Sequence, residues 1–336
     1  MGKRASINNI AKELGISATT VSFVLNGKAK EKRISEKLVK KVLSYIEEVD
    51  YKPNSLARSL RTGKTNTIGL IVEDISDPFF STIAKQIEEK AYQNGYKIIY
   101  SSTEDNADKA KELIQMYRDR HVDGYIIIPP DGIEPEIKDL TASGKPVVVL
   151  DRYLKDVEID YVTVNNLESA YNATKHLINS GRKNIAFITL SSLQSQMMDR
   201  LLGYEMATNE YKLPQYVKEI SYENVDIATK HIVSFLERKT EIDAIFFATN
   251  YLGVSGLKAL RHLGLSIPEQ ISVLCFDDYE LFEMYSPSIT CIAQPIEALA
   301  ENAINILLSR LKKGGVEKKS QKIVLPTTFV ERGSIA

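Results

Sequence analysis

SINNIAKELGISATTVSFVLN, residues 6–26, sets the fold of the N-terminal part of the chain. The apolar side chains of its first half recur at helical spacing, and Gly15 interrupts that pattern. Ser17 then caps a second helix, which has Val21 and Val24 on its apolar side. Two helices joined by a short turn that contains glycine form a helix-turn-helix.

The outer face of the second helix is small, polar or aromatic, and it carries no charge. Such a surface lets a helix lie deep in the major groove of DNA, where hydroxyls and amides meet phosphates and base edges. An alternative is a plain helical hairpin that does not touch DNA. We predict DNA contacts from this helix and its cap, at Ser17, Ala18, Thr19, Thr20, Ser22, Phe23 and Asn26.

The charge of the chain is unevenly distributed. Residues 1–64 contain 14 Lys and Arg against 6 Asp and Glu, a net charge of +8, whereas the whole chain has a net charge of −1. A basic segment joined to an acidic remainder is typical of a protein that binds nucleic acid phosphates through one end. The charge pattern therefore favours the DNA-binding interpretation over the hairpin.

A third helix is expected after the basic loop that follows Asn26. Ser35 is its predicted cap, and Pro53 ends the three-helix head because proline cannot continue a helix. The next segment, residues 54–61, is helix-prone but too short to be a stable helix in water by itself. The predicted packing stripe of the third helix consists of Leu38, Val39, Val42, Leu43 and Ile46.

From Thr65 onwards, apolar strands alternate with amphipathic helices. Strands that are apolar on both faces indicate parallel sheets covered by helices on both sides. The alternation forms two consecutive series, which predict two lobes with a cleft between them. The expected strands begin with residues 67–75, 96–103, 123–130 and 145–152 in the first series, and with 184–190, 242–250 and 271–278 in the second.

TTVSFVLN at residues 19–26 and YKPNSLARSLRTGKTNTIGLIV at residues 51–72 resemble the lactose repressor family of bacterial transcription regulators. The resemblance extends over essentially the entire chain. It implies a helix-turn-helix head, a hinge helix and a core with the two-lobed fold of periplasmic sugar-binding proteins. This agrees with the α/β fold class indicated by the alternating strands and helices.

The resemblance also implies domain boundaries. The head comprises residues 1–52, the hinge and linker 53–64, and the effector-binding core 65–336. Three chain crossings, near Val164, Ile292 and Leu325, join the lobes. The N-lobe then includes about 65–163 plus 293–324, and the C-lobe about 164–292 plus 325–336.

In this family, the hinge helices of a dimer pack together over the centre of the operator, and each inserts a leucine into the minor groove. The motif ARSL places that role on Leu60, with Ala57 at the close approach and Arg58 beside it. An apolar wedge converts the deformability of DNA into specificity. The alternative for Leu60 is packing against its own domain.

Ligands of open α/β sheets bind beyond the carboxyl ends of the strands. Those ends carry carboxylates, an amide and aromatic rings, and an arginine begins the helix after residues 184–190. Such a mixture suits a polyhydroxylated ligand. For any single one of these residues, a helix cap or a lobe-closing pair is the alternative role. The family resemblance implies an effector pocket formed by Phe79, Phe80, Asp151, Arg200, Asn250 and Asp277, with Tyr222 as a further candidate.

Three positions depart from the family pattern. Many members have Arg where this chain has Phe23, so a guanidinium that reads bases is missing. Tyr251 follows Asn250 where the family usually has Asp, and Asn165-Asn166 replaces the more common Asp-Asn. The operator sequence and the effector therefore cannot be borrowed from relatives.

Signals for other functions are weak. The sequence Gly63-Lys64-Thr65 lacks the first glycine of a phosphate-binding loop, because Arg58 occupies that position. The four histidines are isolated, no nucleophile elbow is present, and the pair Asp277-Asp278 has no partner motif. We therefore expect neither an enzyme nor a metal or cofactor site.

The chain carries no apolar run long enough to span a membrane and no apolar signal segment after its basic start. Cys275 and Cys291 lie in apolar contexts and are expected to be buried thiols in a reducing compartment. We therefore expect a cytoplasmic protein, associated with the nucleoid through DNA. The last residues lack leucine heptads, so a dimer is expected and not a tetramer held by a coiled coil.

Together these features predict a transcriptional regulator, expected to be a repressor. It would bind a palindromic operator as a homodimer under control of a small molecule, most simply a sugar or sugar derivative. Two rivals are a sugar-binding carrier with the same two-lobed core and an enzyme built on an α/β core. The basic head argues against the carrier, and the lack of a catalytic constellation argues against the enzyme.

Overall fold

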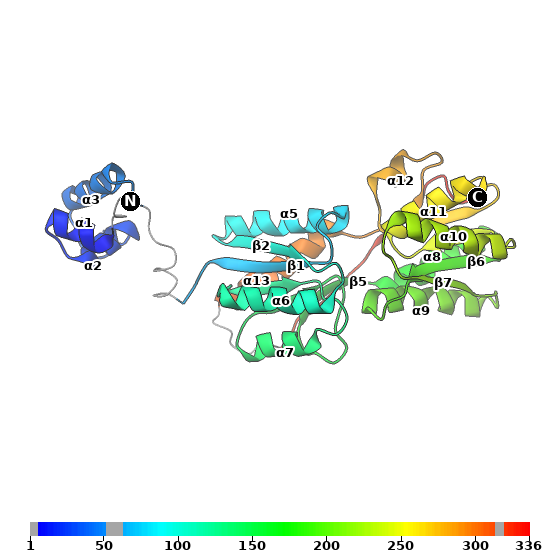
Figure 1. The fold of residues 1–336 in the computed structure, drawn as a ribbon, viewed down its shortest axis with the longest axis horizontal. Coiled ribbons are helices and arrows are strands. Elements are labelled where there is room, and N and C mark those ends of the chain that lie inside the picture. The colour runs from blue at the N-terminus through cyan, green and yellow to red at the C-terminus, as the bar shows by residue number, and fades with distance from the viewer. Residues whose placement is uncertain (1–5, 52–62, 313–318) are drawn as a thin grey trace. The chain divides into compact units, whose positions relative to one another are not determined.

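The computed structural model describes residues 6–51, 63–312 and 319–336. Its contacts divide the chain into two compact units, residues 1–65 and 66–336. The predicted α/β fold class, with an N-terminal helical head and a two-lobed core, is confirmed (Figure 1). Along the described segments no helix is long and apolar enough to cross a lipid bilayer.

The first unit contains α1 (Ile7–Leu14), α2 (Ala18–Leu25) and α3 (Glu36–Glu48). Each helix begins at a serine whose hydroxyl accepts a backbone N–H of the first turn, as in the bond from the N–H of Thr20 to Ser17 Oγ at 3.0 Å. Gly15 has a φ of 64°, the left-handed conformation that ends α1. The buried core of the head is formed by Ile10, Ala11, Val21, Val24 and Val42.

One residue of the predicted packing stripe of α3 is misplaced. Leu38, Val39 and Ile46 pack against the core of the head, but Leu43 is 46% exposed. Leu43 follows directly after Val42, which is fully buried. Neighbouring residues on a helix point about 100° apart, so a narrow stripe centred on Val42 cannot also bury Leu43.

The first lobe of the core contains a sheet in the strand order β11-β5-β4-β3-β1-β2, with all pairs parallel. Helices α5 and α13 cover one face, and α6 and α7 cover the other (Figure 1). Its strands are β1 (Thr67–Val72), β2 (Lys97–Ser102), β3 (Gly124–Ile127), β4 (Val147–Leu150), β5 (Asp160–Val164) and β11 (Lys322–Leu325). Its helices are α5 (Pro78–Gln93), α6 (Ala107–Asp119), α7 (Glu134–Ala142) and α13 (Ile296–Lys312).

The second lobe has the strand order β12-β10-β9-β8-β6-β7, and only the pair β10–β12 of this sheet is antiparallel. Helices α8 and α9 pack on one face, and α10 and α11 on the other. Its strands are β6 (Ile185–Leu190), β7 (Tyr216–Ile220), β8 (Ala244–Phe247), β9 (Ser272–Phe276), β10 (Thr290–Ala293) and β12 (Thr328–Val330). Its helices are α8 (Asn166–Asn179), α9 (Ser195–Glu210), α10 (Val225–Arg238), α11 (Asn250–Leu263) and the short α12 (Glu280–Met284).

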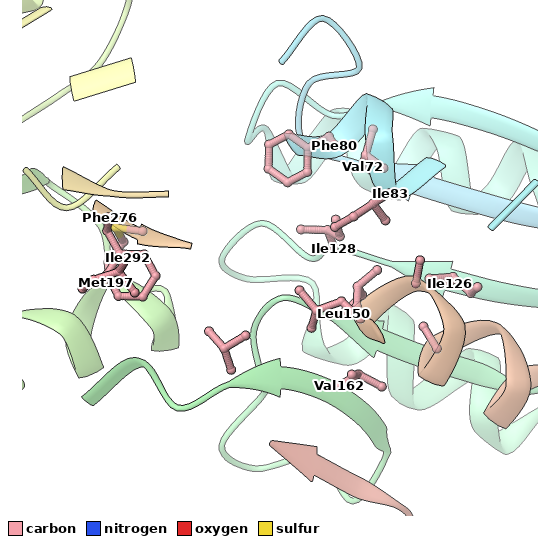
Figure 2. Packing of buried hydrophobic residues seen from close by; sticks show 14 of the residues in the cluster. Val72, Phe80, Ile83, Ile126, Ile128, Leu150, Val162, Met197, Phe276 and Ile292 are labelled. Atoms are coloured by element: carbon pink, nitrogen blue, oxygen red, sulfur yellow. The ribbon is translucent and has the colours of Figure 1, made fainter. Parts of the chain in front are cut away.

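Alternate residues of each buried strand contribute to opposite layers of the core. In β1, Leu70 and Val72 face α5 and α13, whereas Ile71 faces α6 and α7. Figure 2 shows Phe80 and Leu150 in the first lobe, and Met197 and Phe276 in the second. Burial on both faces explains why these strands are almost continuously apolar.

The chain passes between the lobes in three places, from β5 to α8, from β10 to α13 and from β11 to β12. These passages bring α13 back to the first sheet, where it packs beside α5. Both parallel sheets direct the carboxyl ends of their strands towards the junction of the lobes. This arrangement places the loops of two sheets around one cleft.

Candidate functional site

The predicted recognition helix α2 is held by its apolar side and leaves its other side at the surface. Ser17, Thr19 and Asn26 are exposed, and Ala18, Thr20, Ser22 and Phe23 are half-buried. The hydroxyls of Ser17 and Thr20 lie 2.9 Å apart. The surface of α2 is thus small and hydroxylated, as a helix in the major groove requires.

Phe23 of α2 and Asn26, the residue that caps its C-terminus, have partners inside the head. Asn26 Nδ2 donates to the carbonyl oxygen of Ser22 at 2.6 Å, so part of its amide is used within the helix. The ammonium group of Lys32 lies 5.6 Å from the ring centre of Phe23. This cation–π contact places a positive charge beside Phe23.

The three hinge residues predicted to contact DNA, Ala57, Arg58 and Leu60, lie outside the residues that the structure describes. The roles assigned to them stay predictions.

One pocket in the core is lined by residues of both lobes and contains six of the seven predicted effector residues: Phe79, Phe80, Asp151, Arg200, Asn250 and Asp277. Asp151 and Asp277 follow β4 and β9, Phe79, Phe80 and Asn250 lie in the first turns of α5 and α11, and Arg200 lies in the second turn of α9. Its free volume is about 30 Å³, which is roughly the space of one water molecule. Side chains from both lobes therefore leave little free space at this point.

Asp77 connects the two sides of the pocket. It caps α5 by accepting the N–H of Phe79 at 2.8 Å, and it accepts Nδ2 of Asn250 from the second lobe at 3.3 Å. The rings of Phe79 and Phe80 meet edge to face, with centres 5.1 Å apart. Burial raises the pKa of Asp77, and the nearby carboxylates of Glu73 and Asp74 raise it further.

Arg200 is the anchor of the second lobe. Its guanidinium is 2% exposed, donates to Asn166 Oδ1 at 2.8 Å and to the carbonyl oxygen of Ala248 at 2.7 Å, and lies 3.5 Å from the ring centre of Phe276. Its Nη1 is 3.6 Å from a carboxylate oxygen of Asp277. Arg200 therefore joins the crossing before α8 to the ends of β8 and β9.

Asp151 and Asp277 occupy matching positions after β4 and β9. Both have a φ of 71°, a left-handed conformation that aspartate tolerates better than most residues. Burial raises the pKa of both carboxyls, partly offset for Asp277 by Arg200 and by Gln294, which donates to it at 2.6 Å. Each lobe thus presents one buried carboxyl group to the cleft.

Arg152 and Glu73 also line the central pocket, although neither was predicted as a site residue. Arg152 is 3% exposed, and its Nη2 lies 2.7 Å from Glu73 Oε2. Its Nη1 donates to the carbonyl oxygen of Pro129 at 3.0 Å. Glu73 lies near the carboxyl end of the predicted strand 67–75, and Arg152 is the last residue of the predicted strand 145–152, so their position at strand ends was the available signal.

Tyr222 lines a second cavity of about 610 Å³ that shares Glu73, Asp77, Phe80 and Tyr251 with the central pocket. The rings of Tyr222 and Tyr251 lie 4.6 Å apart. The predicted residue Tyr222 is therefore placed in an outer chamber of the cleft and not in the central pocket. We call this chamber the outer cavity.

Side chains at the rim of the cleft also join the lobes. Gln194 Nε2 donates to Asp105 Oδ1 at 2.6 Å, and the hydroxyl of Tyr153 donates to Asp199 Oδ1 at 3.2 Å. The N–H of Tyr153 donates to Ser195 Oγ at 2.9 Å. The start of α9 thus contacts the first lobe, and a change in the angle between the lobes must break these bonds.

The described residues contain no group of three or more His, Cys, Asp or Glu side chains arranged to hold a metal ion. Cys275 and Cys291 are buried free thiols on neighbouring strands, and burial raises the pKa of both. Thiols with raised pKa values are poor nucleophiles at neutral pH.

Comparison with known proteins identifies the family. The family model described as "Bacterial regulatory proteins, lacI family" matches residues 6–54, and the model of the periplasmic binding protein-like domain matches residues 174–335. The HTH-type transcriptional repressor PurR of Aliivibrio salmonicida is 31% identical over 319 residues, which cover 94% of this chain and 95% of that protein. The chain belongs to the lacI family of bacterial regulatory proteins.

Another lacI-type relative, the ribose operon repressor of Haemophilus influenzae, is 31% identical over 335 residues, covering 98% of each chain. Among solved structures, the lac repressor dimer bound to operator and the anti-inducer ONPF matches with a TM-score of 0.86. That match covers 99% of this chain and 100% of the other at 22% identity, and it supports the fold.

As a lacI-family protein, the chain is a DNA-binding transcriptional repressor and not an enzyme. The predicted family and the predicted lack of enzyme function are confirmed. The carrier interpretation is set aside, because the head matches the lacI family and the full-length relatives are repressors.

Proposed function

We propose that this repressor binds a palindromic operator as a homodimer and that a sugar or sugar derivative in the cleft controls its affinity for DNA. The observation that carries the proposal is the convergence of six side chains from both lobes on one pocket, described above. Paired carboxylates, an arginine and an amide bind hydroxyl groups, and the rings of Phe79 and Phe80 can cover the apolar face of a sugar.

The proposed assignment keeps the domain boundaries at residues 1–52, 53–64 and 65–336. Helix α2 enters the major groove, and the hinge residues Ala57, Arg58 and Leu60 act in the minor groove at the operator centre. Two identical heads related by a two-fold axis match two half-sites, so the operator is a palindrome. Because operator DNA lies in the bacterial cytoplasm, the protein works there.

Control requires a ligand with different affinity for two arrangements of the lobes. The hydrogen bonds that join the lobes across the cleft, among them Asn250 to Asp77 and Gln194 to Asp105, provide such a difference. A ligand that fills the pocket must displace or replace them. The resulting change in the angle between the lobes would either favour or disfavour the hinge helices of the dimer.

Thermal-shift screening of the full-length protein tests the proposal, with a panel of mono- and oligosaccharides, sugar phosphates, nucleosides and purines. A ligand at about 100 times its dissociation constant adds about 2.7 kcal/mol to the free energy of unfolding. A hit among the sugars, followed by a changed affinity for operator DNA in its presence, supports the proposal. A hit confined to purines or nucleosides would contradict the sugar assignment.

A further inference from the structure

The charged side chains that line the two chambers of the cleft are mostly acidic, which is unfavourable for an anionic ligand. Among the described residues that line the outer cavity, every charged side chain is acidic: Glu73, Asp74, Asp77, Glu104, Asp105 and Glu223. The central pocket adds Asp151 and Asp277 and two arginines. A phosphate or carboxylate in this cleft would face like charges on most sides.

The two arginines are already engaged by the protein. Arg152 is paired with Glu73, and with the amide oxygen of Gln196 turned towards it, its Nε also donates to Gln196 at 3.0 Å. Arg200 donates to Asn166 and to a backbone carbonyl oxygen, and it lies against Phe276. Neither guanidinium presents the open fork that binds an anion in a bidentate manner.

Two acceptor groups that line the central pocket have hydrogen-bonding capacity to spare. Oε1 of Gln294 is fully buried and accepts no hydrogen bond from any residue that the structure describes. Asp77 accepts hydrogen bonds from two neutral donors, the N–H of Phe79 and the amide of Asn250. A ligand rich in N–H donors would satisfy these groups.

Two acidic side chains of the cleft are held where ionisation is unfavourable, while Glu73 is paired with Arg152 and Glu104 with Lys109, each at 2.7 Å. Burial raises the pKa of Asp105 to about 6, and the carboxylate of Glu73 contributes to the shift. Burial also raises the pKa of Asp77. A positive charge beside them would favour their ionised forms.

The outer cavity also contains aromatic faces. Tyr222 and Tyr251 form a tilted pair with ring centres 4.6 Å apart, and Phe80 belongs to the same wall. Carboxylates combined with aromatic rings are the surroundings that bind an organic ammonium group, through charge and cation–π attraction. The acidic side chains and the aromatic rings of the outer cavity both favour a positively charged ligand.

We propose that the effector carries a protonated amine, seated in the outer cavity between the carboxylates of Glu73, Asp77 and Asp105 and the rings of Tyr222 and Tyr251. The inference rests on the proposed function, because it defines the chemical class of the effector of that same cleft. An amino sugar combines the ammonium group with the hydroxyls expected for the central pocket.

Matched probes test the charge of the ligand. Binding to the full-length protein is measured by thermal shift and calorimetry at low salt with glucosamine, galactosamine and cadaverine. The neutral controls are glucose, galactose and 1,5-pentanediol. The anionic controls are glucose 6-phosphate and galactose 6-phosphate. We expect at least one amine to bind about tenfold or more tightly than its neutral counterpart, and the phosphates not to bind. The proposal is overturned if no amine at 10 mM exceeds its neutral partner.

A variant pair separates the cleft from general attraction to an acidic protein. Asp77→Asn removes one charge but preserves the cap of α5, because asparagine caps helices as well as aspartate. It should weaken binding of the amine about tenfold. Glu88→Gln, an equal charge change at an exposed position of α5, should leave it unchanged. Equal losses in both variants would contradict a site in the outer cavity.

The same experiment distinguishes this inference from the proposed function. If a neutral sugar binds and changes operator affinity while its amine does not, the sugar-controlled repressor stands and the amine is refuted. If an amine binds in the manner expected but operator affinity is unchanged, the ammonium site stands and control by the cleft is refuted.

Discussion

Replacing Arg200 with methionine removes the guanidinium from the centre of the second lobe while keeping much of its length. The buried carboxylate of Asp277 then loses the positive charge that lies 3.6 Å from it in the parent protein. Asn166 Oδ1 and the carbonyl oxygen of Ala248 lose the hydrogen bonds that Arg200 donates. Breaking one partner of a buried ion pair costs about 3–5 kcal/mol. Because the two charges are as far apart as 3.6 Å, we expect Arg200→Met to lower the free energy of unfolding by about 3 kcal/mol, near the lower end of that range.

The consequence is measurable by urea unfolding followed by circular dichroism, since the chain contains no tryptophan. A loss of about 3 kcal/mol corresponds to a melting temperature lowered by roughly 6–12 °C for a core of this size. The loss should shrink on going from pH 8 to pH 5. Without Arg200 the pKa of Asp277 rises further, and the neutral carboxyl that forms at low pH needs no cation.

The matched control is the double variant Arg200→Met with Asp277→Asn. An amide in place of the uncompensated carboxylate should restore about 1–2 kcal/mol of the lost stability at pH 8. The reasoning is refuted if Arg200→Met is as stable as the parent protein, or if its deficit is the same at pH 5 and pH 8. At 20 °C, where the variant stays folded, it should also lose the response to effector while still binding operator DNA.

Three further predictions concern other parts of the chain. Leu60→Ala should weaken operator binding by about tenfold or more in an anisotropy titration without changing ligand binding, and unchanged affinity would sink the wedge assignment. Asp105→Asn should stabilise the protein by about 1 kcal/mol at pH 7.5 and not at pH 4, as urea unfolding at both pH values will check. The pKa of Asp105 is raised to about 6, so the ionised carboxylate that forms as the pH rises from about 4 to 6 destabilises the folded state. Its side chain is 43% exposed, so solvent screening limits the gain. Gly203→Ala should destabilise the protein by about 1–3 kcal/mol in urea unfolding, because a Cβ there would collide with the carbonyl oxygen of Leu167 and lie 2.8 Å from the backbone nitrogen of Tyr171 on α8. An unfolding free energy equal to that of the parent would show that the two helices separate freely.

Much of the fold follows from local sequence because its elements are strongly patterned. Strands β1, β3 and β4 are nearly all apolar, and the helices between them have one apolar face. The sequence analysis did not assign β5, β7 or β10. The residues of β7, YVKEI, include two adjacent charges, which an edge strand tolerates, and β5 and β10 lie at the crossings between the lobes. Their place depends on contacts with distant parts of the chain.

The candidate site was predictable to a similar degree. Residues after strands, such as Asp151 and Asp277, could be located because parallel strands end at the same edge of a sheet. Arg152 was passed over, since only the folded chain shows that it pairs with Glu73, 79 residues away in the sequence. The chamber that Tyr222 occupies depends on how closely the lobes approach, which no local pattern encodes.

The central claim is that a ligand in the cleft sets the affinity of the head for DNA. The most direct measurement is the affinity of the full-length protein for an operator fragment, selected from genomic DNA, with and without the ligand that thermal-shift screening identifies. The account predicts a change of about tenfold or more in the parent protein and no change in Asp77→Asn at a ligand concentration that saturates only the parent. An operator affinity that stays constant while the ligand is bound to the parent would contradict it.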